Sequence, residues 1–169
     1  AEEHVLMPCV VTGLRAAVLA LTKPGDSIII QPPVYGPFYF SIKDNERKIM
    51  ECPLNCDENG RYTMNLESIE EACKNGAKMM MLCNPHNPVG RVWREDELRR
   101  VGDLCLKYNV FVICDEIHND LICKGHKHTV YATLGEEYAK NCIIGTAPSK
   151  TFSLAGLCLA NMIIPDPEK

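Results

Sequence analysis

Polar and aromatic side chains follow several apolar runs of this sequence, at the points where strands would end. They are the amine of Lys150, the carboxylate of Asp115, the amide of Asn87 and the ring of Tyr35. An amine is a nucleophile only when it is neutral, so a lysine in a cleft can attack a carbonyl carbon once its pKa is lowered. A carboxylate at the mouth of an apolar strand is partly desolvated and needs a cation or hydrogen-bond donors beside it. This combination suits nucleophilic attack on a carbonyl compound.

Each of these positions also has an ordinary structural explanation. Lys150 in a polar loop can be a solvated surface residue, and Asp115 can cap the start of a helix. Tyr35 follows two prolines, and it can either pack in the core or stack on a planar ligand. The positions therefore form a site only if the fold brings them together.

The spacing of apolar residues predicts the elements that would do so. The predicted buried strands are residues 27–31, 78–83, 110–114 and 142–145. The predicted helices are residues 38–44, 66–73 and 95–108. This alternation predicts an α/β fold with a mainly parallel, doubly wound sheet and helices on both faces. In such a sheet, ligands bind in a crevice outside the carboxyl ends of the strands.

The first residues predict a strand, a turn and a helix. Residues 4–7 form an apolar run that Pro8 ends, and a helical pattern begins at Leu14. The N-terminus of a helix offers unpaired N–H groups and the positive end of its dipole, so the amides of Val10 and Val11 could bind a phosphate. The alternative is a plain strand-to-helix turn. An anion cradle, a flat ring, an amide, a carboxylate and an amine together suit a phosphorylated pyridine aldehyde.

Composition limits the class of protein. The 169 residues are 46% hydrophobic and 24% charged, which is ordinary for one globular domain. A net charge of −4 without a basic run argues against nucleic acid or a membrane surface as partner and favours a small molecule. The ten cysteines are scattered, mostly in apolar runs, where we expect small buried hydrophobic residues. Without a signal peptide or a membrane-length apolar run, we expect a cytoplasmic protein.

The order of four motifs resembles a known family. Pro-Val-Tyr at 33–35, Asn-Pro-His-Asn-Pro-Val-Gly at 84–90, Asp-Glu-Ile-His at 115–118 and Ser-Lys at 149–150 resemble the large domain of fold-type I pyridoxal 5′-phosphate (PLP) enzymes, the aspartate aminotransferase superfamily of class I/II. The stretches at 83–93, 124–128 and 147–152 resemble its cystathionine β-lyase-like branch, the bacterial C–S lyases.

The resemblance implies a role for each matched residue. Lys150 would hold PLP through an imine and later move the α-proton of the substrate. Asp115 would pair with the pyridinium nitrogen, Asn87 would hydrogen-bond the phenolic oxygen, and Tyr35 would stack on the ring. The amides of Val10 and Val11 and the hydroxyl of Ser149 are then the groups that would bind the phosphate.

Two positions depart from the aminotransferase pattern. His118 stands where many aminotransferases have a tyrosine that touches the phenolic oxygen, and this departure favours a lyase over a transaminase. Cys158 stands where aminotransferases usually have a phosphate-binding arginine, so more of the phosphate charge would fall to amides and hydroxyls.

The resemblance therefore implies a C–S β-lyase that cleaves cystathionine or related L-cysteine thioethers to pyruvate, ammonia and a thiol. An aminotransferase is the first alternative, and a PLP-binding regulatory protein without turnover is the second. No metal is expected, because the spacing of Cys123, His126 and His128 fits no common zinc pattern. Cysteine catalysis is not expected either, because Cys83 and Cys114 point into apolar runs.

The resemblance also predicts how the chain is organised. Residues 1–164 would be an incomplete PLP-binding large domain, and residues 165–169 would begin the link to a C-terminal small domain. That small domain would supply the arginine that grips the substrate carboxylate. A neighbouring subunit would supply a tyrosine to the phosphate, so we expect a homodimer at full length. We expect the 169 residues alone to bind PLP weakly and to turn over little.

Overall fold

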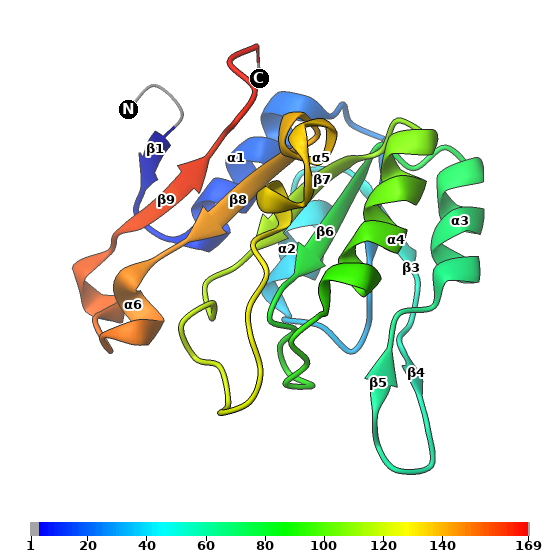
Figure 1. Cartoon of the computed structure of the whole chain (residues 1–169). Helices are drawn as coiled ribbons and strands as arrows, with labels where there is room; N and C mark the ends of the chain where they lie inside the picture. Colours follow the sequence, from blue (N-terminus) through cyan, green and yellow to red (C-terminus); the bar gives the residue numbers. More distant parts are fainter. Residues whose placement is uncertain (1–3, 169) are drawn as a thin grey trace.

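The computed structural model describes residues 4–168 and is built around one seven-stranded sheet (Figure 1). The strand order is β1-β9-β8-β7-β6-β2-β3. These strands are β1 (His4–Met7), β2 (Ser27–Ile30), β3 (Lys48–Glu51), β6 (Met79–Cys83), β7 (Phe111–Asp115), β8 (Cys142–Thr146) and β9 (Ala160–Ile163). From β8 across to β3 the neighbours are parallel, whereas β9 runs antiparallel to both β8 and β1. The prediction of a mainly parallel sheet is therefore confirmed.

Helices cover both faces of the sheet, which is why its central strands are apolar throughout. One apolar cluster joins alternate strand residues to α1 (Val10–Leu21) and α2 (Pro37–Lys43). The other joins the remaining strand residues to α3 (Leu66–Lys74) and α4 (Glu95–Lys107). The 3₁₀ helix η1 (Tyr131–Leu134) and α5 (Glu136–Lys140) complete this second face. All five residues of β6 are buried between the two layers.

The start of α1 differs from the sequence prediction. The helix begins at Val10, four residues before the predicted start at Leu14, so residues 10–13 are neither strand nor turn. Gly13, the residue before the predicted start, lies inside the helix, where its lack of a side chain serves packing. A Cβ atom there would lie 2.2 Å from Sδ of Met162 on β9, so glycine lets the helix lie directly against the sheet. This glycine therefore marks the close approach of α1 to β9.

Other differences from the prediction lie at the periphery. Residues 55–60, expected as a polar turn, begin a small hairpin formed by β4 (Asn55–Cys56) and β5 (Tyr62–Thr63). Six of the ten cysteines are buried, as expected for most of them, and four are exposed. Within residues 4–168 no helix is long and apolar enough to cross a membrane.

Candidate functional site

A cavity of about 210 Å³ lies outside the carboxyl ends of the central strands. We call it the strand-end cavity. Every site residue predicted from the sequence lines it: Val10, Val11, Tyr35, Asn87, Asp115, His118, Ser149 and Lys150. These residues come from five separate stretches of the chain, each of which follows a strand of the sheet.

Asp115 forms the buried acidic part of this cavity. It is the last residue of β7 and is only 4% exposed. Its Oδ1 accepts a hydrogen bond from the Ile117 amide at 3.1 Å, and no salt bridge to it exists within residues 4–168. Burial raises the pKa of Asp115 to about 6, because desolvation penalises the charged form more than the Ile117 amide and Lys150 stabilise it. A cationic ligand would supply the missing partner.

Lys150 belongs to α6 (Pro148–Thr151), the short helix that follows β8. The residue is exposed and its side chain borders the strand-end cavity. Thr151 donates a hydrogen bond from Oγ1 to Oδ2 of Asp120 at 2.8 Å, which ties α6 to the loop after β7. Burial, and then the charge of Lys150, lowers the pKa of His118. The amine and the imidazole therefore act on each other across the cavity.

Tyr35 and Asn87 line the cavity from the ends of β2 and β6. Tyr35 lies edge-on to Phe38, with ring centroids 6.3 Å apart and an interplanar angle of 78°, and burial raises its pKa. Asn87 lies in the turn at 84–90, where its backbone N–H donates a hydrogen bond to Sγ of Cys83 at 3.3 Å. A ring and an amide side chain that border the same cavity can position a planar ligand by stacking and by hydrogen bonding.

The amides of Val10 and Val11 stand in the first turn of α1. The first hydrogen bond inside this helix runs from the Gly13 amide to the Cys9 carbonyl at 3.2 Å, so the amides before Gly13 have no acceptor within the helix. The first turn holds no acidic residue. Together with the helix dipole, these amides favour an anion.

Two cysteines that the sequence analysis discounted or overlooked also border the cavity. Cys83 belongs to an apolar cluster, as expected, yet it also lines the cavity. Burial raises the pKa of Cys83, so it is a thiol rather than a nucleophilic thiolate. Cys9 was missed because the helix was expected to start later. It is exposed, and a hydrogen bond between its Sγ and Oγ1 of Thr12, at 3.2 Å, lowers its pKa.

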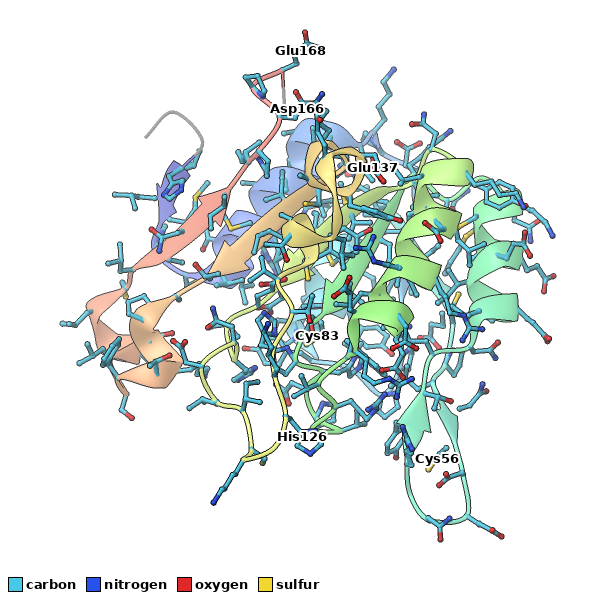
Figure 2. The ribbon with its side chains drawn as sticks, in the orientation of Figure 1. Cys56, Cys83, His126, Glu137, Asp166 and Glu168 are labelled. Atoms are coloured by element: carbon cyan, nitrogen blue, oxygen red, sulfur yellow. The ribbon has the colours of Figure 1, made fainter. Side chains whose placement is uncertain are left out.

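A second cavity, of about 400 Å³, lies beside the first. We call it the loop cavity, because the turn at 85–92 and the loop after β7 form its walls. Asn87 and His118 line both cavities. Figure 2 shows Cys83 at the carboxyl end of β6 and His126 near the outer turn of the loop.

Glu116, which is fully buried, joins the two ends of the loop after β7 by hydrogen bonds. We call the pair of Glu116 and His128 the clasp. Nε2 of His128 donates to Oε2 of Glu116 at 2.9 Å, and the Tyr131 amide donates to Oε1 at 2.8 Å. The Glu116 amide in turn donates to the Gly145 carbonyl of β8 at 2.8 Å. The pairing of Glu116 with His128 could not be predicted from the sequence, because the two residues are twelve positions apart across an irregular loop.

The arrangement can bind an anionic, planar molecule with a cationic ring and present a lysine amine to it. Within the described part of the chain, no three histidine, cysteine, aspartate or glutamate side chains gather as metal ligands. Cys123 and His126 border the loop cavity, whereas His128 pairs with Glu116.

Comparison with known proteins adds independent findings. Residues 1–167 match the family Aminotransferase class I and II. The chain is 45% identical over 166 residues to cystathionine β-lyase PatB of Bacillus subtilis strain 168, covering 98% of this chain and 43% of that protein.

Two solved structures share the fold closely. Cystalysin from Treponema denticola, which contains a pyridoxal 5′-phosphate cofactor, matches with a TM-score of 0.96 and 43% identity over 99% of this chain and 42% of that one. The PLP-bound C–S lyase from Staphylococcus hominis matches with a TM-score of 0.93 and 32% identity over 98% and 42%. The chain spans less than half the length of each of these proteins.

Proposed function

This chain belongs to the aminotransferase class I and II family, and from that premise we propose that it is the cofactor-binding part of a PLP-dependent C–S β-lyase. The substrate would be cystathionine or a related L-cysteine thioether. In the overall reaction, one thioether and one water give pyruvate, ammonia and a thiol. The observation that carries the proposal is that Lys150 borders the same cavity as the buried carboxylate of Asp115, which forms no salt bridge within residues 4–168.

The residues of the strand-end cavity fit PLP group by group. Asp115 lacks a cation, and a protonated pyridine nitrogen would supply one. The amides of Val10 and Val11 and the hydroxyl of Ser149 would hold the phosphate. Tyr35 would lie against the ring, and Asn87 and His118 would face its phenolic oxygen. The chemistry that PLP supplies when bound is withdrawal of the electron pair left at Cα of the amino acid.

The protein's own groups would then move the α-proton of the substrate and hold the cofactor in place. Lys150 would bond the cofactor at rest and, once displaced by the substrate amine, accept the α-proton through Nζ. Asp115 would keep the ring nitrogen protonated, and a protonated ring favours loss of the α-proton from the amino acid. The Cβ–S bond would break with its electron pair on sulfur, and the thiolate would leave as a thiol after taking a proton, for which the protonated Nζ of Lys150 is the available donor. The product of that step loses its amino group to water, which gives pyruvate and ammonia.

Three further proposals concern the whole protein. Residues 1–164 would form the large domain, and residues 165–169 would begin the link to a small domain. The full-length protein would be a homodimer. It would work in the cytoplasm, which agrees with ten cysteines that form no disulfide in the structure.

Pyruvate release tests the proposed reaction. The full-length, PLP-loaded enzyme should release pyruvate from L-cystathionine, and Lys150→Ala should lower kcat by about 1,000-fold, because both the covalent link and the proton acceptor are lost. Lys127→Ala removes the same charge from an exposed loop residue that lines neither cavity, and it should keep full activity.

The same assay separates the alternatives. Transfer of the amino group to a keto acid without pyruvate would identify an aminotransferase, in line with the name of the family. A cofactor absorption band without turnover of any amino acid would identify a regulatory PLP-binding protein.

A further inference from the structure

The loop cavity is continuous with the strand-end cavity through shared residues. Asn87 and His118 line both, so the loop cavity directly adjoins the cavity that Lys150 borders. The volume of the loop cavity, about 400 Å³, lies in the usual range for small-molecule sites and is nearly twice that of the strand-end cavity. Of the proposed cofactor contacts, Asn87 and His118 border this space, and the others lie outside its lining.

The lining of the loop cavity contains basic and amide side chains but no carboxylate. Arg91 lines it with a guanidinium that donates from Nε to the Tyr62 carbonyl at 2.7 Å and pairs with Glu97, which is not a lining residue. Burial lowers the pKa of His86 to about 4, so this imidazole is neutral near pH 7. The single N–H of the neutral His86 ring meets the Pro33 carbonyl at 3.0 Å, so the side-chain donors left for a carboxylate or an amide are those of Asn87, His118 and His126. An ammonium group would find no carboxylate among the lining residues.

The walls of the loop cavity are held by hydrogen bonds within the chain. The outer wall is the loop clasped by Glu116, and it is braced internally by hydrogen bonds from the Leu121 amide to the His118 carbonyl at 2.9 Å and from the His126 amide to the Cys123 carbonyl at 3.1 Å. The opposite wall is the proline-rich turn at 85–92. A preformed site loses little ordering entropy on binding.

We propose that the loop cavity receives the sulfur substituent of the thioether, and that it selects substituents ending in a carboxylate or an amide over those ending in an ammonium group. This inference rests on the proposed β-lyase function. It assigns to His126 and the lining around it a specificity role separate from the chemistry at Lys150.

Three thioethers that share a two-carbon spacer after the sulfur test the selection. They are S-(2-carboxyethyl)-, S-(2-carbamoylethyl)- and S-(2-aminoethyl)-L-cysteine, each given to the full-length, PLP-loaded enzyme, with S-methyl-L-cysteine as a reference that barely enters the loop cavity. The kcat/KM for the carboxyethyl compound should exceed that for the aminoethyl compound by about tenfold, chiefly through KM. The carbamoyl compound should resemble the carboxyethyl one.

A charge placed in the loop cavity should reverse this order. His126→Glu supplies a carboxylate, so the ratio of kcat/KM for the carboxyethyl to the aminoethyl compound should fall to about one or below. Lys127→Gln is the matched control, because it changes charge by the same amount at the next residue, which does not line the loop cavity. It should leave the ratio unchanged.

Binding measured without turnover provides a second readout. Dissociation constants of the same compounds, measured by calorimetry on the full-length Lys150→Ala variant, should follow the same order and change in the same way with His126→Glu. Equal constants for all three compounds, or equal effects of His126→Glu and Lys127→Gln, would overturn the assignment of the loop cavity. If none of these thioethers, nor L-cystathionine, releases pyruvate while the order of dissociation constants holds, the proposed reaction fails, and the loop cavity keeps its preference for a carboxylate or an amide over an ammonium group.

Discussion

The carboxyl group of Asp115 destabilises the folded chain when it is ionised, because it is buried without a cationic partner in the described residues. Its pKa rises from 3.8 to about 6 on folding. The folded state therefore holds the proton more tightly than the unfolded state, and this contribution to stability is present below pH 4 and is lost as the pH rises through 6. A shift of about two pKa units corresponds to about 3 kcal/mol.

Replacing Asp115 by asparagine should separate stability from function. In the cofactor-free, full-length protein, Asp115→Asn should raise the free energy of unfolding at pH 7 by about 1–3 kcal/mol and should flatten its dependence on pH between 4 and 6. The same variant should lower kcat for pyruvate release by about 100-fold or more, because the ring nitrogen loses its anion. Urea unfolding at several pH values and the pyruvate assay measure the two effects.

Asp26 provides the control, since its carboxylate lies in a surface turn and accepts from the Lys23 amide at 2.7 Å. Asp26→Asn should leave the activity and the pH dependence above pH 5 unchanged. A pH profile of stability that is the same for Asp115→Asn and the parent protein would contradict the account of the buried carboxylate.

Residues at strand ends were predictable for a physical reason. Asp115, Asn87 and Lys150 each follow an apolar run long enough to be recognised as a buried strand, and parallel strands bring their carboxyl ends to one edge. Cys9 was not predictable in this way. Its place in the cavity depends on the start of α1, and Gly13 made that start look like a turn because a close contact with Met162 leaves no trace in the local sequence.

At the scale of elements, the clasp of Glu116 and His128 decides how the loop after β7 is held. The side chains are 0% and 7% exposed, so breaking the pair leaves a buried polar group without its partner. The loop also presents His118 to both cavities. Loss of the clasp should therefore loosen a cavity wall as well as reduce stability.

A double-mutant cycle on this pair tests the clasp. Glu116→Gln and His128→Leu should each destabilise the full-length protein by about 2–4 kcal/mol, with a coupling energy of about 1–3 kcal/mol in the double variant. Each should also raise KM for cystathionine several-fold. Urea unfolding and initial rates give both quantities.

The exposed pair of Arg99 and Glu95 on α4 serves as the comparison, because surface ion pairs contribute at most about 1 kcal/mol. Arg99→Gln should leave KM unchanged. Additive effects of Glu116→Gln and His128→Leu on the free energy of unfolding would contradict a direct clasp.

Elements differ in how far their sequence determines them. The central strands and the amphipathic helices α3 and α4 could be predicted from the spacing of apolar residues. The strands are buried on both faces, and each of the two helices buries one face. Strand β9 was not predicted, because it is only half-buried and gains its place by antiparallel pairing with β8 and with β1, which lies more than 150 residues earlier in the chain. Pairing over such separations has no local signal.

At the scale of the whole molecule, the segment at 152–159 carries a group of exposed apolar side chains. Phe152, Leu154, Leu157 and Leu159 are between 41% and 71% exposed. Leu159 also lines the strand-end cavity, so this group of side chains reaches the edge of the proposed cofactor site. Contiguous exposed apolar side chains are typical of an interaction surface. A second copy of the full-length chain is the partner that the homodimer proposal assigns to it.

A charge in the middle of this segment should therefore separate the subunits. Leu157→Glu would place a carboxylate without a partner in an apolar interface, and the full-length protein should shift from dimer to monomer in size-exclusion chromatography with light scattering. Phe40→Glu on α2, at a similarly exposed apolar residue outside the segment, should leave the dimer intact. Because Leu159 borders the strand-end cavity, the Leu157→Glu monomer should also bind PLP at least tenfold more weakly, measured by fluorescence titration. A dimer that survives Leu157→Glu with unchanged affinity for PLP would show that this surface is not the subunit interface.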